Sequence, residues 1–265
     1  MRLVTFRGAA VALCFTLSAC AGQQASDDSA LKSQTSTSGE ESPERARGRI
    51  HTELAASYYS LGNMPVAVEE IRQAIASDPN YGPAHNVAGL IYARLNDDRR
   101  ATESFQRALA INPNDYDTHN NYGLFLCERK REREAIQHFQ LALRNPLYPY
   151  PDRSLVNAGL CARRSGDVAG AEDYMKQVLK VRPTQPQALY QLADISFMRG
   201  DLEAARDYMG RLTKSAQSNA EALWLGVRIA RRLGDRNAEA SYALQLRNRF
   251  PDSAEVRALN AGRYD

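Results

Sequence analysis

The sequence predicts an all-α protein, a superhelical solenoid of six helix-turn-helix units closed by a short C-terminal helix. Glycine followed by aspartate recurs at intervals of 34 residues, at Gly166, Gly200 and Gly234. Proline recurs with the same period at Pro79 and Pro113. A small residue followed by a large apolar one keeps the same phase, in the pairs Ala67 and Ile71, Ala101 and Phe105, Ala135 and Phe139, Ala171 and Met175, and Ala205 and Met209.

The chain begins with a segment typical of an export signal, residues 1–19. Two arginines are followed by an apolar stretch, Gly8–Leu17, which is too short to span a bilayer, since that needs roughly 20 apolar residues. The segment ends in Leu17-Ser18-Ala19-Cys20, which resembles the bacterial lipobox and implies lipidation of Cys20. By resemblance to lipoprotein sorting rules, Ala21 implies the outer membrane, so we expect the protein on its periplasmic face.

Residues 20–46 are predicted to form the lipidated cysteine and a flexible tether. This stretch is rich in Ser, Thr, Gln and Gly and has almost no apolar side chains, so it cannot bury enough surface to fold. The formal charge of +3 falls to about +1 without Arg2 and Arg7, which belong to the export signal. A nucleic-acid-binding protein would need a strong basic excess, so we expect no nucleic-acid partner.

The remaining residues, 47–265, are predicted to form the repeat domain. A glycine or asparagine at the tight turn can adopt the positive φ that ends the first helix, and the proline stops the second helix. No unit can bury its apolar face alone, so the units stack. Val256 and Leu259 are expected to cover the last unit. The predicted units are 48–81, 82–115, 116–151, 152–185, 186–219 and 220–253, followed by a cap over 254–265.

This period resembles the tetratricopeptide repeat, and the resemblance implies a right-handed superhelix whose first helices line a groove. In the first three units the implied partner-binding residues are Tyr59, Asn86, Leu90, Asn120 and Leu124. In the last three units the same positions are largely basic: Arg153, Arg163, Arg164, Arg228, Arg231 and Arg232, with Asp194 and Trp224 among them. We expect the main contact at the apolar end, because apolar burial supplies affinity, whereas charge mainly affects the association rate.

The residues capable of catalysis or metal binding do not form a site in this pattern. His51, His85 and His119 are 34 residues apart, so equivalent atoms lie about one helix spacing, roughly 8–10 Å, from one another. Zinc ligands must lie much closer together, so packing roles are expected, and His138 stands alone on a second helix. Cys127 lies more than two helical turns from His119, too far for a nucleophilic pair. We therefore predict no enzyme activity, metal, cofactor or small-molecule substrate.

Cys127 and Cys161 fall in the first helices of the adjacent third and fourth units. Because paired thiols are oxidised in the periplasm, a disulfide is expected; the alternative is two buried free cysteines acting as small apolar residues. The third unit is two residues longer than the others, since the proline-rich segment 145–151 interrupts the period. The junction between these units is therefore predicted to be the weakest of the array.

Two segments, Asn120–Cys127 and Pro146–Cys161, resemble the PilF/PilW family of type IV pilus biogenesis lipoproteins. The broken third unit and the cysteine pair are features that generic repeats would not share. The resemblance implies an outer-membrane pilotin, which helps the secretin, the pore through which the pilus emerges, to reach the outer membrane and multimerise. The implied partner is the secretin subunit.

Two other functions remain open on the residues alone. A lipid-anchored repeat protein could be a scaffold of the machinery that assembles outer-membrane proteins. It could also be an adaptor that holds a cell-wall enzyme in its groove. Both are binding functions, and they differ from the first only in the partner.

Overall fold

The computed structural model of the protein describes residues 41–215 and 218–264. The chain divides into two compact units, Met1–Glu41 and Ser42–Asp265, and the helices of the described part all belong to the second. The predicted export signal, Cys20 and the tether as far as residue 40 lie outside the described residues. Among the described helices, none combines the length and the apolar character needed to cross a bilayer.

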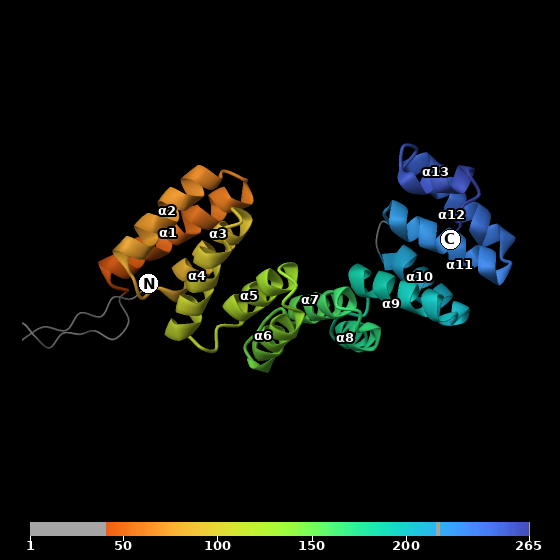
Figure 1. Cartoon of the computed structure of the whole chain (residues 1–265). Helices are drawn as coiled ribbons and strands as arrows, with labels where there is room; N and C mark the ends of the chain where they lie inside the picture. The colour runs from red at the N-terminus through yellow and green to blue at the C-terminus, as the bar shows by residue number, and fades with distance from the viewer. Residues whose placement is uncertain (1–40, 216–217, 265) are drawn as a thin grey trace, which may run out of the picture. The chain divides into compact units, whose positions relative to one another are not determined.

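The described residues form thirteen helices and no strand, which confirms the predicted fold class. Twelve of the helices pack as six consecutive hairpins, each hairpin followed in space by the next (Figure 1). Their bounds are α1 (Pro43–Ser60), α2 (Met64–Ser77), α3 (Gly82–Arg94), α4 (Asp98–Ile111), α5 (Tyr116–Glu128), α6 (Glu132–Arg144), α7 (Pro151–Arg164), α8 (Val168–Val181), α9 (Pro186–Arg199), α10 (Leu202–Ser215), α11 (Ala220–Leu233) and α12 (Arg236–Arg249). The cap is α13 (Ala254–Asn260).

The first helix starts earlier than predicted, which corrects the end of the tether. α1 begins at Pro43, so residues 43–46 are helical. The local sequence explains this, because the Ser42 side chain accepts a hydrogen bond from the Arg45 amide at 3.2 Å and proline occupies the first helical position. Both are helix-start signals. Arg45 also pairs with Asp78 of the same hairpin, so the added turn is attached to the domain.

All six turns inside the hairpins use a residue with positive φ, as the period predicts. Four of these residues are glycine, and the other two are Asn96 and Lys130, with φ of 58° and 59°. The left-handed conformation ends the first helix and lets the chain reverse at once. The full set is Gly62, Asn96, Lys130, Gly166, Gly200 and Gly234.

Small residues pack against large ones inside the hairpins. The recurrent alanines and the large apolar residues that follow them are buried, with Phe105 and Phe139 fully enclosed. On the first helices, Gly89 and Gly123 lie directly against these two rings: an added Cβ would come within 2.6 Å and 2.7 Å of them. The absence of a side chain there lets the paired helices approach.

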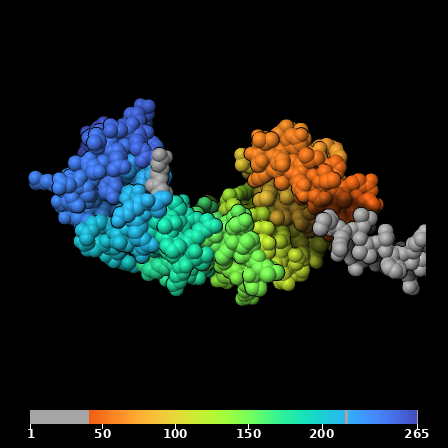
Figure 2. Space-filling view, turned by 180° about the vertical axis from the view of Figure 1, so that it is seen from behind, coloured from red at the N-terminus to blue at the C-terminus, as the bar shows by residue number. Residues whose placement is uncertain are grey.

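Helices pack most extensively within each hairpin, and further contacts join each unit to its neighbours in the chain. The units follow one another in the same order in the space-filling view (Figure 2). First helices of neighbouring units touch, α1 with α3, α3 with α5, α5 with α7, and α9 with α11. These helices therefore share one face of the array, which we call the inner face. At the C-terminal end, Val256 and Leu259 of α13 are buried against α11 and α12, as predicted.

Candidate protein-binding site

Three of the five predicted partner-binding residues line a common groove on the inner face. Tyr59 of α1, Leu90 of α3 and Leu124 of α5 border a hollow of about 250 Å³, which we call the N-terminal groove. Leu124 remains 39% exposed, although it is a leucine on a well-packed helix. The remaining lining residues are Ala93, Arg94, Asn96, Asn121, Phe125, Glu128 and Arg129.

The polar border of the N-terminal groove is held in place by the neighbouring unit. Arg129 donates to the Asp98 carboxylate at 2.9 Å and to the Ala93 carbonyl at 3.2 Å, and its guanidinium lies 5.1 Å from the centre of the Phe125 ring. The Asn121 amide donates to Asn86 Oδ1 at 3.1 Å. The groove thus has an ordered polar edge beside an apolar floor, as protein interfaces commonly have an apolar core and a polar rim.

The structure corrects the prediction for Asn120. Its side chain is only 3% exposed, and its Oδ1 accepts hydrogen bonds from Ser154 Oγ at 2.9 Å and Asn157 Nδ2 at 3.0 Å. Asn120 therefore joins the third unit to the fourth and does not meet a partner. Its neighbour Asn121 lines the groove instead, a one-residue error that helical periodicity alone does not resolve.

Several of the predicted basic residues are already engaged within the array. Arg163 pairs with Asp194 of the next first helix. The Arg153 guanidinium lies 5.3 Å from the centre of the Tyr150 ring, and that of Arg232 lies 5.2 Å from the centre of the Phe197 ring. That the main partner contact lies in the first three units, and not at these arginines, stays a prediction.

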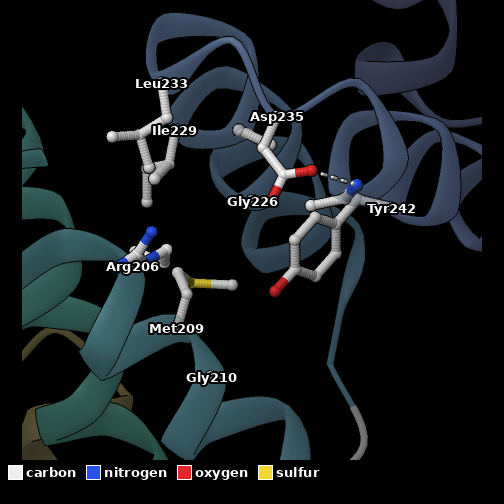
Figure 3. Close-up of a pocket in the computed structure, with 10 residues that line it drawn as sticks. Arg206, Met209, Gly210, Gly226, Ile229, Leu233, Asp235 and Tyr242 are labelled. Carbon is white, nitrogen blue, oxygen red and sulfur yellow. Dashed lines mark hydrogen bonds between the residues drawn. The ribbon is translucent and has the colours of Figure 1, made fainter. Parts of the chain in front are cut away.

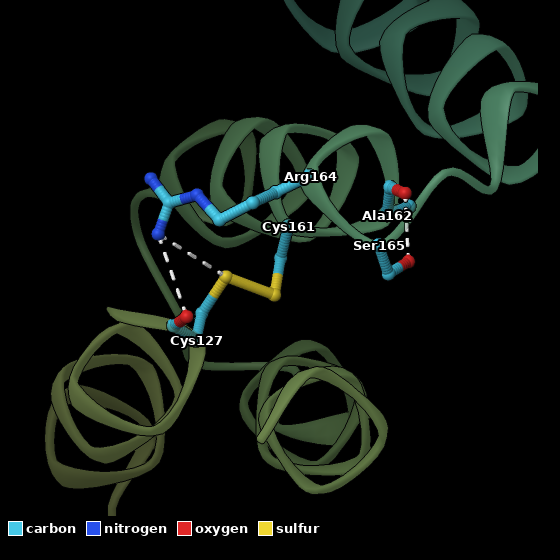
Figure 4. Close-up of a disulfide and its surroundings, with 5 residues drawn as sticks. All are labelled: Cys127, Cys161, Ala162, Arg164 and Ser165. Carbon is cyan, nitrogen blue, oxygen red and sulfur yellow. Dashed lines mark hydrogen bonds between the residues drawn. A yellow bond between two sulfur atoms is a disulfide. The ribbon is translucent and has the colours of Figure 1, made fainter. Parts of the chain in front are cut away.

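Cys127 of α5 and Cys161 of α7 meet at the junction of the third and fourth units (Figure 4). Their sulfurs lie 2.15 Å apart and their Cα atoms 5.9 Å apart, within the span of about 4.4–6.8 Å that a disulfide requires. Arg164 donates to the Cys127 carbonyl at 3.4 Å, across the same junction. That the bond forms in the exported protein remains a prediction.

His51 and His85 have separate packing partners. His51 Nδ1 lies 2.7 Å from Glu70 Oε2, and His85 Nε2 lies 2.9 Å from the Pro79 carbonyl oxygen. No group of three or more potential metal ligands occurs among the described residues. The expectation that His138 stands alone is wrong, because its Nδ1 lies 2.9 Å from His119 Nδ1 within the same hairpin.

A second hollow lies inside the last two units, where α10 meets α11 and α12. Met209 and Arg206 of α10 face Tyr242 of α12 across it, and the glycines Gly210 and Gly226 leave it open (Figure 3). Its volume is about 140 Å³, well below the roughly 300–1,000 Å³ of small-molecule sites. It is a packing gap between helices.

The fold and the N-terminal groove define a class, the tetratricopeptide-repeat scaffold, a non-catalytic fold for protein interaction. Models of the tetratricopeptide repeat match residues 52–116, 104–137 and 162–226. The solved structure of YrrB, described as a TPR protein with an unusual peptide-binding site, has a TM-score of 0.56 over 73% of this chain and 97% of its own. At 18% identity it shows the fold alone.

Two solved structures are much more similar. PilF of Pseudomonas aeruginosa has 30% identity and a TM-score of 0.75, over 83% of this chain and 100% of PilF. PilW, a type IV pilus biogenesis factor, has 35% identity and a TM-score of 0.71, over 80% of this chain and 98% of PilW. No curated protein sequence matches the chain significantly. The chain belongs to the PilF/PilW family of type IV pilus biogenesis proteins.

Proposed function

We propose that the chain is an outer-membrane pilotin lipoprotein, which binds the secretin subunit of the type IV pilus and promotes its localisation and multimerisation. The observation that carries the proposal is the similarity to PilF and PilW over 83% and 80% of the chain. Repeat proteins of other families can cover a comparable share of the chain, as YrrB does over 73%, but YrrB has only 18% identity, whereas PilF and PilW have 30% and 35%. In this role the chain needs no catalytic chemistry and no cofactor.

The lining of the N-terminal groove suits a protein segment as its ligand. Tyr59, Leu90 and Leu124 offer apolar surface, whose burial contributes about 25 cal/mol per Å² before the costs of ordering. Asn121 lines the groove, and beyond its hydrogen bond to Asn86 its side-chain amide can still bond to the backbone of an extended or helical segment. A secretin subunit must be held before the ring closes, and an apolar segment that the ring later buries fits this groove.

The groove is tested with Leu124→Glu, which places a charge on its floor. The matched control is Leu141→Glu on α6: Leu141 is also 39% exposed but does not line the groove. We expect Leu124→Glu to abolish secretin multimers in outer-membrane fractions and Leu141→Glu to leave them unchanged, with equal helical content by circular dichroism. If instead Leu124→Glu supports assembly and the pair Arg228→Glu with Arg231→Glu abolishes it, the contact lies at the C-terminal end.

We also propose that Cys20 carries the lipid anchor and that the anchor places the protein in the outer membrane. Cys20→Ala should give a fully helical protein that no longer sediments with outer membranes after a salt wash. Sedimentation of this variant with the membrane would overturn the anchor. Co-purification of barrel-assembly proteins or cell-wall hydrolases, in place of secretin, would assign the scaffold to one of those partners.

A further inference from the structure

The end of the chain folds back onto the inner face of the last unit. Gly262, with φ of 64°, follows α13, and the Arg263 amide donates to the Ala258 carbonyl at 3.0 Å, which closes the helix end. The chain then runs to Tyr264, whose ring stacks on Trp224 of α11 with centroids 5.5 Å apart and an interplanar angle of 23°. The tail, residues 261–264, therefore lies where the groove of the sixth unit would receive a partner.

The residues that hold Tyr264 form one stripe of α11. Trp224, Arg228 and Arg231 are spaced by four and three residues, so they share one face of the helix. Arg231 places its guanidinium carbon 3.9 Å from the Tyr264 ring centre, a cation–π arrangement. Arg228 Nε donates to the Tyr264 carbonyl at 3.0 Å. We call these three residues the aromatic clamp.

Neighbouring side chains fix the aromatic clamp. Glu239 of α12 binds Arg231 at 3.0 Å, and the Arg228 guanidinium lies 4.7 Å from the centre of the Phe197 ring of α9. Because these contacts do not involve the tail, they set the geometry of the clamp in advance. Preorganised groups lose less entropy on binding.

The clamp recognises features that any extended peptide can offer. It takes one aromatic ring and one main-chain carbonyl, and neither is peculiar to the tail. The apolar core of the last unit is covered by α13, because Val256 and Leu259 are buried against α11 and α12. Tyr264 lies outside this core and is only partly buried. No carboxylate of the described residues forms an ion pair with Arg228 or Arg232, so the surface beside the ring keeps a positive charge that favours an acidic neighbour.

We propose that the aromatic clamp is a second peptide-binding site, distinct from the N-terminal groove, for a partner segment with an aromatic residue followed by an acidic one. Tyr264, followed in the sequence by Asp265, occupies this site in cis and must leave before the partner segment binds. The tail acts as a built-in competitor, because a short linker gives it an effective concentration in the millimolar range. The site does not depend on which pilus protein is the partner.

The chain supplies its own probe, because Trp224 is its only tryptophan. Tyr264→Ala should empty the clamp and change the Trp224 emission, whereas Tyr264→Phe should keep the emission of the natural protein. The ligand is a synthetic acetylated peptide with the sequence of residues 261–265, and a copy with alanine in place of its tyrosine is the peptide control. We expect saturable binding to Tyr264→Ala, at least about tenfold weaker binding to the natural protein, and no binding of the alanine peptide.

Two further measurements separate binding from a merely structural role of the tail. Adding Arg231→Gln to Tyr264→Ala should remove peptide binding while the thermal midpoint stays within a few degrees of that of Tyr264→Ala. Absence of saturable binding to Tyr264→Ala up to millimolar peptide, with its helical content intact, would show that the tail is only a cap. Equal affinity of the peptide for Tyr264→Ala and the natural protein would show that the tail does not compete. Either result overturns the proposal.

Discussion

Lys130 occupies a turn position where four of the six units have glycine, and it adopts the same left-handed conformation, with φ of 59°. For a residue with a Cβ this conformation costs roughly 1–2 kcal/mol, and Lys130 has no asparagine-like side chain to offset the cost. The cost is tolerated because α5 and α6 are buried against each other on both sides of the turn.

We therefore predict that Lys130→Gly stabilises the protein by about 0.5–1 kcal/mol, since glycine removes the strain but adds some freedom to the unfolded chain. The measurement is the urea midpoint followed by circular dichroism. Lys130→Ala, which keeps a Cβ, is the control and should leave the midpoint close to that of the natural protein. Equal gains from both variants would mean that the lysine side chain, and not its φ, is the unfavourable element.

His138 has a pKa lowered to about 4, chiefly because burial disfavours its charged form, and further because His119 lies against it. Glu134 opposes this shift and Arg131 adds to it. The two facing Nδ1 atoms lie 2.9 Å apart, so one ring must donate and the other accept. Because His119 Nε2 donates to the Pro113 carbonyl oxygen at 2.9 Å, His119 Nδ1 is the acceptor and His138 Nδ1 the donor. A second proton on His138 would keep that hydrogen bond but place a charge in a largely buried position.

The consequence is a loss of stability in mild acid. Because the folded-state pKa is below that of the unfolded chain, the unfolded state binds more protons between pH 6.5 and 4, and stability falls as the pH falls through that window. Since the ring is partly exposed, we expect a loss of about 1 kcal/mol. His138→Phe keeps a ring but cannot titrate, so its stability should vary less between pH 7 and 4.5. An unchanged acid slope in this variant would assign the acid sensitivity to other groups.

At the scale of the helix, two glycines of similar appearance in the sequence have opposite surroundings. Gly123 of α5 faces the Phe139 ring of α6, and an added Cβ would lie 2.7 Å from it. Gly210 of α10 has no atom within 4 Å of the same point and borders the hollow of Figure 3. Gly123 is therefore required by packing. Gly210 lowers the stability of its helix and no packing contact requires it.

The matched substitutions should therefore change stability in opposite directions. Gly210→Ala should stabilise by about 0.5–1 kcal/mol, the helix-propensity difference. Gly123→Ala should destabilise by about 1–3 kcal/mol, because overpacking forces the ring or the helix to move. Urea unfolding of both variants measures the difference. A loss of stability in Gly210→Ala would mean that α10 needs glycine for a reason other than packing.

How far the sequence predicts these elements depends on whether a feature repeats. The turn residues and the alanines against large apolar residues repeat every 34 residues, so their places followed from the period. The burial of Asn120 did not follow from the period, because Asn120 bonds to Ser154, whose Oγ also lies 3.0 Å from the hydroxyl of Tyr148 in the irregular insertion. The aromatic clamp could not be predicted from the sequence for the same reason. Tyr264 lies beyond the last repeat, and only the folding back of the tail brings it to Trp224 and Arg231.

At the scale of the whole array, the junction between the third and fourth units differs from the others. The insertion was expected to weaken this junction, but its own side chains pack there. Tyr148 is buried, and its ring stacks on that of Tyr116 with centroids 4.8 Å apart. Asn120 and Ser154 add a buried hydrogen bond. The Cys127 and Cys161 sulfurs then join the two first helices directly. Because repeat arrays gain stability from interfaces between neighbours, a covalent link here would couple two halves of three units each.

We predict that this disulfide forms in the exported protein and that reducing it weakens the array at this junction first. The bond closes a loop of 34 residues, which in the chain-entropy model corresponds to up to about 4 kcal/mol. Dithiothreitol should therefore lower the thermal midpoint, and hydrogen exchange should rise first in α5 to α8. The Cys127→Ser, Cys161→Ser double variant is the control, because its midpoint should already be low and should not respond to the reductant. Free thiols on both cysteines, found by mass spectrometry of non-reduced peptides from the exported protein, would refute the bond. A uniform rise in exchange over all six units would show instead that the buried tyrosine and asparagine contacts hold the junction without it.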